Sequence, residues 1–262
     1  MLSTQETAWL NDNNVNEISH VEQFKHALTN DVFLLTTNKN TKYIFKRLNR
    51  DARSDEDREE ELLVQQLASE NGLTTKVLAS SKCYRLQQYV EGDLIPNDIA
   101  GLSDFLAVQF HRIHQLPAKH APKQRLYFEL QRLKKQLPVN IDEHYFKEMS
   151  LLAKQLDESC ACDTLCHGDL SLNNVLQSDG GAIYIIDWEY AVIATPAYDL
   201  AFCNCINNFS SSVSSSLIAS YHSKFNHPTG ASLETLQKKC DLYLTIFNYI
   251  NELWCVCFVE KN

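Results

Sequence analysis

The chain has 262 residues, 44% of them apolar, which is enough for one large domain or two small ones with a sizeable core. Its net charge of -9 argues against nucleic acid as a partner and against general affinity for anionic membranes. No apolar stretch has the length of a membrane span and the first residues do not resemble a secretion signal, so we expect a cytoplasmic protein without stable membrane insertion.

The nine cysteines are an odd number in a long chain, which favours reduced thiols over a disulfide framework. Six of them form C-x-C pairs, at 160/162, 203/205 and 255/257. Zinc sites prefer C-x2-C spacing with matching partners, so these pairs do not predict a metal centre. We expect most of the cysteines to pack as small apolar side chains.

The front of the chain is rich in predicted strands. Apolar runs at 32–35 and 43–45 flank the polar turn 38–40, a pattern that predicts a β-hairpin. Helical spacing of apolar residues predicts a helix within 51–71, and Asn71-Gly72 is a typical helix end.

Two further strands are predicted at 77–78 and 84–90, after which Glu91-Gly92-Asp93 breaks the pattern. Beyond residue 98 helices dominate, with one predicted strand over 182–186. The expected helices cover 99–116, 124–137, 143–158, 197–207, 212–225 and 232–258. A strand-rich front and a helical rear indicate an α+β fold, divided near residue 91 into 1–91 and 92–262.

The segment 165–176 carries the most informative pattern. It contains H-G-D-x-x-x-x-N, in which Asn174 follows Asp169 by five residues, and the next apolar strand ends at Asp187. In phosphoryl transfer one carboxylate takes the proton of the attacking hydroxyl, while an amide and a second carboxylate hold magnesium on the ATP phosphates. This order and spacing predict a kinase, with Asp169 catalytic and with Asn174 and Asp187 as magnesium ligands.

Each of these residues has a simpler explanation when taken alone. Asp169 could cap a loop, and Asp187 could be a turn residue at a strand end, but their combination favours catalysis. We interpret His167 as a structural anchor of the loop, because Asp169 already fills the role of base. Asp199 either accepts hydrogen bonds from backbone amides of the catalytic loop or N-caps the following helix, and the sequence leaves both open.

A second set of candidates lies in the front part. Lys46 follows a predicted strand and could reach the ATP phosphates if a helix glutamate held it in place. Glu59, Glu60 and Glu61 form a run, so spacing alone does not select one. The first glycine of the chain is Gly72 and no G-x-x-x-x-G-K-[ST] segment occurs, which excludes the P-loop class.

These motifs together resemble the choline/ethanolamine kinase family and its relatives, the aminoglycoside phosphotransferases and bacterial thiamine kinases. The segment 166–176 is similar to the catalytic loop of that family, and 185–191 to its metal-binding segment with Glu-Tyr after the aspartate. The resemblance covers nearly the whole chain. It implies a protein-kinase-like two-lobed fold, with a nucleotide-binding lobe over 1–91 and a helical catalytic and acceptor-binding lobe over 92–262.

The resemblance also implies roles in nucleotide binding. Residues 28–34 resemble the family's nucleotide loop, with Thr29 and Asn30 as phosphate neighbours and with Ala27 where the family carries glycine. Residues 57–61 resemble a D/N-R-x-x-E helix start, which selects Glu61 as the partner of Lys46. The segment 88–92, with Gln88 and Val90, resembles the link between the lobes whose backbone holds the adenine.

The acceptor pocket is where the chain departs from the family. The family's late W-x-x-W helix corresponds to residues 251–254, in which Asn251 replaces the first tryptophan. Trp254 could offer a cation–π face to a cationic acceptor or pack in the core with its helix neighbours. Glu189 could supply negative charge to the same acceptor.

We therefore expect an ATP- and Mg²⁺-dependent kinase that phosphorylates the hydroxyl of a small cationic alcohol, with choline or ethanolamine first. Thiamine kinase and aminoglycoside phosphotransferase are the alternatives within the family. A nucleotide-binding pseudokinase is the non-enzyme alternative, while a metal-dependent hydrolase lacks a paired histidine motif. The sequence leaves the acceptor and the oligomeric state open.

Overall fold

The computed structural model describes residues 2–24, 30–49, 54–137, 141–159, 163–224 and 232–258. The chain forms two compact units, the first made of 1–93 with 176–189 and the second of 94–175 with 190–262. The segment 176–189 therefore belongs to the strand-rich first unit, although it follows the catalytic motif in sequence. The expected division of roles between a nucleotide lobe and an acceptor lobe stays a prediction.

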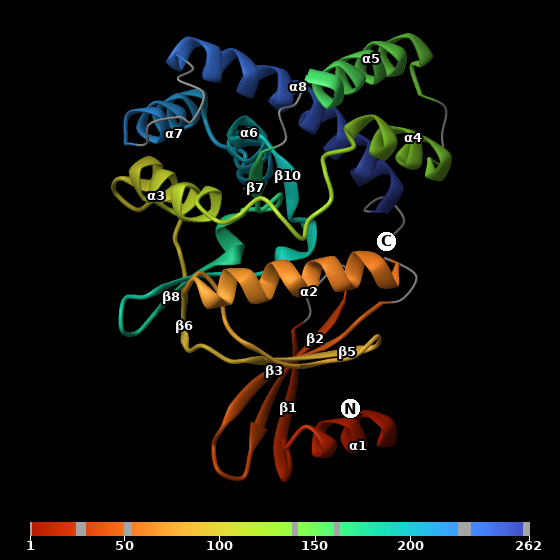
Figure 1. Cartoon of the computed structure of the whole chain (residues 1–262), viewed down its shortest axis with the longest axis vertical. Helices are drawn as coiled ribbons and strands as arrows, with labels where there is room; N and C mark the ends of the chain where they lie inside the picture. Colours follow the sequence, from red (N-terminus) through yellow and green to blue (C-terminus); the bar gives the residue numbers. More distant parts are fainter. Residues whose placement is uncertain are drawn as a thin grey trace. The chain divides into compact units, whose positions relative to one another are not determined.

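The first unit is built on a five-stranded antiparallel sheet in the order β1-β2-β3-β5-β4 (Figure 1). Its strands are β1 (Ile18–Phe24), β2 (Asp31–Thr37), β3 (Lys42–Arg47), β4 (Val77–Ser80) and β5 (Tyr84–Gln88). The predicted hairpin is confirmed as β2 and β3, which pair from Asp31–Arg47 to Thr36–Lys42. β1 was not predicted, because as an edge strand it buries little and shows no alternation.

The two faces of this sheet carry different side chains, because successive residues of a strand point to opposite sides. On one face Phe45 and Leu86 form a buried cluster with Leu10 of α1 (Thr4–Asp12). On the other face Arg85 bonds to Glu61 of α2 (Asp55–Glu70). The sheet thus lies between the apolar contact with α1 and the charged contact with α2.

Helix α1 is fixed at its start by a capping box, in which the Ser3 side chain accepts from the Glu6 amide and the Glu6 carboxylate accepts from the Ser3 amide. The same carboxylate, almost fully buried, also binds Arg47 of β3 at 2.6 Å. The S-x-x-E pattern was readable in the sequence, but no apolar periodicity supported a helix there.

Removing the α1 contact is expected to destabilise the first unit. Leu10 is fully buried in the cluster with Phe45, so Leu10→Ala leaves a cavity and should lower the free energy of unfolding by about 2–5 kcal/mol. Leu78→Ala on β4 is the matched control, because that side chain is about half exposed and its loss should cost about 0.5 kcal/mol. Urea unfolding of the two variants measures both values, and equal losses would contradict this packing.

A second sheet, in the order β6-β8-β9, combines β6 (Gly92–Leu94) with β8 (Val175–Ser178) and β9 (Ile183–Ile185). Strand β5 ends at Gln88, before the expected break at 91–93. Gly92 lies in the separate strand β6, so close to Gln177 that a Cβ atom would overlap the Gln177 carbonyl oxygen. One expectation is wrong here. More than one strand follows the motif, because β8 has only four residues and too few positions to show a period.

The second unit is mainly helical (Figure 1). Its elements are α3 (Leu102–His114), α4 (Leu126–Gln136), α5 (Glu143–Ser159), β7 (Thr164–Cys166), β10 (Val192–Ala194), α6 (Pro196–Asn207), α7 (Ser211–Lys224) and α8 (Leu233–Phe258). Each predicted helix beyond residue 98 corresponds to one of these. Within the described ranges, no helix combines the length and apolarity needed to cross a membrane. Antiparallel β7 and β10 lie on either side of the catalytic motif in sequence and pair through Cys166–Val192.

Aromatic side chains join α6 to α8 in this unit. Tyr198 packs edge-on against Phe247, with ring centroids 4.8 Å apart, and Phe202 packs against the same ring at 5.0 Å. Tyr243 stacks on Phe247 and donates its hydroxyl to Gln124 at 2.8 Å. Edge-to-face pairs of this kind add to the apolar burial, so α8 is held firmly along α6.

Candidate active site

The loop that carries Asp169 is held in the second unit by one buried carboxylate. Asp199, inside α6, accepts the backbone amide of His167 with one oxygen and that of Gly168 with the other, both at 2.8 Å. The N-cap of α6 is Thr195, so the alternative in which Asp199 caps the helix is wrong. A carboxylate makes stronger hydrogen bonds to backbone amides than a neutral acceptor does, so Asp199 fixes this part of the loop.

Gly168 allows the turn that places Asp169. Its φ of +77° lies in the region that L-residues rarely adopt, and a Cβ atom there would overlap the Tyr190 carbonyl oxygen. The amide of Asp169 then donates to Nδ1 of buried His167 at 3.2 Å. His167 thus contacts the loop backbone from a buried position, and its role as a structural anchor stays a prediction.

Asn174 orients the carboxylate of Asp169. Its Nδ2 donates to the Asp169 backbone oxygen at 2.8 Å and to Asp169 Oδ2 at 3.1 Å. The amide nitrogen is therefore used by Asp169, and the amide oxygen is the atom that Asn174 can offer to a cation. Asn207 of α6 supports the same loop by accepting the Leu172 amide at 2.8 Å and donating to the Leu170 oxygen.

Neighbouring asparagines allow a controlled test of Asn174. We expect Asn174→Ala to lower kcat on the order of 10²-fold, because it removes both the donor that orients Asp169 and the amide oxygen. Asn173→Ala is the control, since that side chain is exposed. Steady-state assays over a range of Mg²⁺ concentrations measure both variants, and equal behaviour of the two would contradict the assignment.

His114 of α3 is part of this support and was missed in the sequence. Its Nε2 lies 3.1 Å from Asp199 Oδ2, and its Nδ1 lies 2.8 Å from the hydroxyl of Tyr221 on α7. Cys166 lies close enough to His114 and Asp199 for the three to resemble a metal cluster. Both Asp199 oxygens already accept backbone amides, however, so the group fits loop support and not a metal ion.

In the first unit Asp187 is paired with Lys46. The Lys46 Nζ donates to Asp187 Oδ1 at 2.9 Å. Burial alone lowers the pKa of Lys46, but the carboxylates of Asp187, Glu61 and Glu189 outweigh it, and the net effect raises the pKa. Asp187 has φ +67°, an unusual backbone conformation that often marks functional sites. The Lys46 ammonium group is suited to bind phosphate, and the Asp187 carboxylate is suited to bind a metal ion.

The expected pair between Lys46 and Glu61 is not the one that the structure forms. Glu61 Oε2 binds Arg58 at 2.9 Å, and its Oε1 binds Arg85 in a very short contact. The two guanidinium groups come from α2 and β5 and use both oxygens of the carboxylate. Glu61 therefore acts on Lys46 through its charge, while the direct partner of Lys46 is Asp187.

Glu189 is also buried, contrary to what an acceptor contact would require. About 4% of its side chain is exposed, and its Oε2 lies 3.6 Å from Arg58 Nη1 and accepts from Asn30 Nδ2 at 3.3 Å. Asn30 is thus part of this buried group in the first unit. Thr29 and Ala27 of the expected nucleotide loop lie outside the described residues.

The remaining candidates, Gln88, Val90 and Trp254, have side chains that are exposed or half-buried. Gln88 ends β5 with an exposed side chain, and Val90 follows it half-buried. Trp254 on α8 is half-buried, whereas Tyr243 and Phe247 of the same helix are buried. Trp254 is thus only partly in the core, and the choice between a core and an acceptor role stays open to experiment.

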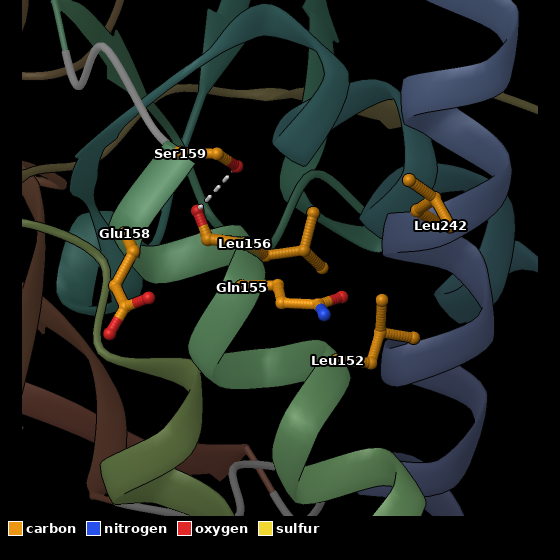
Figure 2. Close-up of a pocket in the computed structure, with 6 residues that line it drawn as sticks. All are labelled: Leu152, Gln155, Leu156, Glu158, Ser159 and Leu242. Atoms are coloured by element: carbon orange, nitrogen blue, oxygen red, sulfur yellow. Dashed lines mark hydrogen bonds between the residues drawn. The ribbon is translucent and has the colours of Figure 1, made fainter.

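A shallow cavity of about 450 Å³ lies elsewhere in the second unit, between α5 and α8. Figure 2 shows Leu152 and Leu156 of α5 on one side and Leu242 of α8 on the other. The other lining residues are Gln155, Glu158 and Ser159. None of the predicted site residues lines it, so this cavity is separate from the phosphoryl-transfer candidates.

Solved structures with the same fold include several kinases. Choline kinase LicA from Streptococcus pneumoniae is 22% identical with a TM-score of 0.76, covering 99% of this chain and 92% of that one. A choline/ethanolamine kinase family protein from Mesorhizobium loti is 17% identical with a TM-score of 0.70, covering 93% and 81%. The APH(2")-IIa chain of a ternary complex with streptomycin and ATP is 15% identical with a TM-score of 0.65, covering 99% and 96%.

These likenesses confirm the predicted α+β, protein-kinase-like fold with a small sheet-based lobe and a helical lobe. A search of curated protein sequences found no match. The sequence profile of the phosphotransferase enzyme family matches residues 20–233, which is more than half of the chain. The chain therefore belongs to the phosphotransferase enzyme family.

Proposed function

We propose that this chain is an ATP- and Mg²⁺-dependent kinase that phosphorylates the hydroxyl of a small cationic alcohol, with choline or ethanolamine as the first candidates. The observation that carries the proposal is Asp169, whose carboxylate is oriented by Asn174 on a loop that Asp199 holds by two backbone amides. The likeness to choline kinases over nearly the whole chain supports the choice of acceptor class.

In this mechanism Asp169 acts on the acceptor. Its side chain is half-buried, so an acceptor hydroxyl can reach a carboxylate whose direction is already set. The carboxylate orients the hydroxyl and takes its proton as the oxygen attacks the terminal phosphorus of ATP, while the bond from that phosphorus to its bridging oxygen breaks and ADP leaves. Because the loop is fixed before the acceptor arrives, little reorganisation is needed in the transition state.

Each unit offers an oxygen donor of a kind that suits magnesium. Asp187 offers a carboxylate and Asn174 an amide oxygen, and Mg²⁺ prefers hard oxygen ligands of this kind. Bound Mg²⁺ would supply charge neutralisation on the phosphate oxygens. Lys46, protonated in its pair with Asp187, would turn to the ATP phosphates, and the backbone near Gln88 and Val90 would hold the adenine. LicA has been solved with AMP, which supports a nucleotide in this fold.

An aromatic side chain of α8 supports a cationic acceptor. Half-buried Trp254 could present a face to a quaternary or primary ammonium group. Glu189, expected as the acceptor's counter-charge, is compensated by Arg58 instead. Thiamine is the next candidate and an aminoglycoside the third, and the likeness to APH(2")-IIa over 99% of this chain supports keeping the latter.

A coupled ADP-release assay tests the acceptor. Purified protein with Mg·ATP is offered choline, ethanolamine, thiamine, kanamycin or no acceptor, and kcat/KM is compared. The proposal expects ADP release to depend on an acceptor and to be highest with choline or ethanolamine. A higher kcat/KM with kanamycin would move the assignment to the aminoglycoside enzymes, and ATP binding without turnover on any alcohol would favour the pseudokinase alternative.

A further inference from the structure

Arg58 has several polar partners in the first unit, although the sequence did not mark it as a site residue. Only about 8% of it is exposed. One nitrogen, Nη1, binds Glu61 at 2.9 Å, and the other, Nη2, donates to Asn30 Oδ1 at 2.8 Å and to the Asn49 oxygen at 3.3 Å. A planar guanidinium presents five donors in a fixed fork, so its separate nitrogens reach partners that lie farther apart than the donors of a single ammonium nitrogen can.

The fourth partner of Arg58 is Glu189, whose Oε2 lies 3.6 Å from Nη1. Glu189 stands two residues after Asp187, so the pair connects the start of α2 to the segment with the expected metal ligand. Asn30 closes the group, because its Oδ1 accepts from Arg58 while its Nδ2 donates to Glu189. Both ends of one amide therefore hold the two charged residues together.

The charges of this buried group are balanced. Glu61 is bound by Arg58 on one oxygen and by Arg85 on the other, while Lys46 is paired with Asp187. Glu189 supplies the remaining negative charge beside Arg58. A buried charge that loses its partner strongly destabilises the folded state. The pairing with Arg58 therefore explains the burial of Glu189 without an acceptor.

We propose that Arg58 is a positioning residue for the metal-binding segment: it holds Glu189, and through Glu189 it sets the position of Asp187. The arginine of the D-R-x-x-E helix start and the glutamate of Asp187-Trp188-Glu189-Tyr190 then work as a pair. Its consequence for catalysis rests on the proposed kinase function. Its structural part, the coupling of Arg58 with Glu189, does not.

A double-mutant cycle with R58M, E189Q and the combined variant tests the pair. Thermal unfolding gives the first readout: each single variant should lower the Tm, and the combined variant should lower it by less than the sum of the two losses. Binding of Mg·ATP without acceptor, followed by tryptophan fluorescence, gives the second, and both single variants should weaken it about tenfold. E59Q is the control on the same helix, since Glu59 is exposed, and it should change neither readout.

Kinetics separate positioning from acceptor binding. The KM for Mg·ATP should rise in R58M and in E189Q, while the KM for the acceptor stays within about twofold of wild type. If E189Q raises only the acceptor KM and its Tm loss adds fully to that of R58M, Glu189 contacts the acceptor and the proposal is overturned.

R58K replaces R58M if the latter does not fold, and it should reproduce the loss of Mg·ATP affinity because lysine cannot span Asn30 and Glu61 together. If no alcohol is phosphorylated, the Tm cycle and Mg·ATP binding still decide whether Arg58 and Glu189 are coupled. If activity is normal and the coupling is absent, the positioning role fails while the kinase function stands.

Discussion

Replacing Asp169 with asparagine is expected to lower kcat by about 10²- to 10⁴-fold, because the variant keeps the shape of the side chain but removes the proton acceptor. Asn174 can still donate to the new amide oxygen, so the loop should keep its geometry. Binding of Mg·ATP should change little, since the acceptor hydroxyl is the group that Asp169 serves. Single-turnover assays and nucleotide titrations measure the two quantities separately.

Asp179→Asn is the matched control, because this aspartate is exposed and belongs to the turn between β8 and β9. It should leave kcat near that of wild type. Near-normal phosphorylation by Asp169→Asn would remove this carboxylate from the mechanism, whatever the family resemblance implies.

The second large effect is expected at Gly168. Gly168→Ala forces a side chain into positive φ and places its Cβ on the Tyr190 carbonyl oxygen, so the loop must shift. Asp169 and the two amides bound by Asp199 would shift with it. Because a displacement of about 1 Å can cost 10²-fold in rate, we expect kcat to fall by at least about that factor and the Tm to fall as well.

Gly101→Ala separates the two contributions to this effect. Gly101 has the same φ of +77°, but a Cβ atom there meets nothing within 4 Å. It therefore carries the backbone strain without the steric overlap, and it lies at the N-cap of α3. A loss of activity as large in Gly101→Ala as in Gly168→Ala would show that the contact with Tyr190 is unimportant.

Residue types and spacing drew attention to Asp169 and Asn174, and the structure brings their side chains together, while their chemical roles stay a prediction. Asp169 and Asn174 are five residues apart on one loop, so sequence distance reports their contact directly. For Asp199 the sequence could not decide between binding the backbone amides of the loop and capping a helix, because a carboxylate near a helix start suits either role. The position of Thr195 as N-cap decided between them, and that depends on where α6 begins.

The charged group of the first unit could not be predicted in the same way. The family resemblance selected Glu61 from the run of three glutamates but not its partner Arg85, which lies 24 residues away on β5. Glu189 and Arg58 lie still farther apart in sequence, so only the folded chain shows that they meet. Short strands such as β8 were missed because four residues carry no readable period.

The most direct test of the central claim is to detect the transferred phosphoryl group on the acceptor itself. Wild-type protein and Asp169→Asn are each incubated with Mg·ATP and choline or ethanolamine, and the products are identified by mass spectrometry. The kinase assignment predicts a phosphorylated alcohol, formed in step with ADP by the wild-type protein and nearly absent with the variant. ADP formed without any phosphorylated alcohol, or equal product from both proteins, would contradict it.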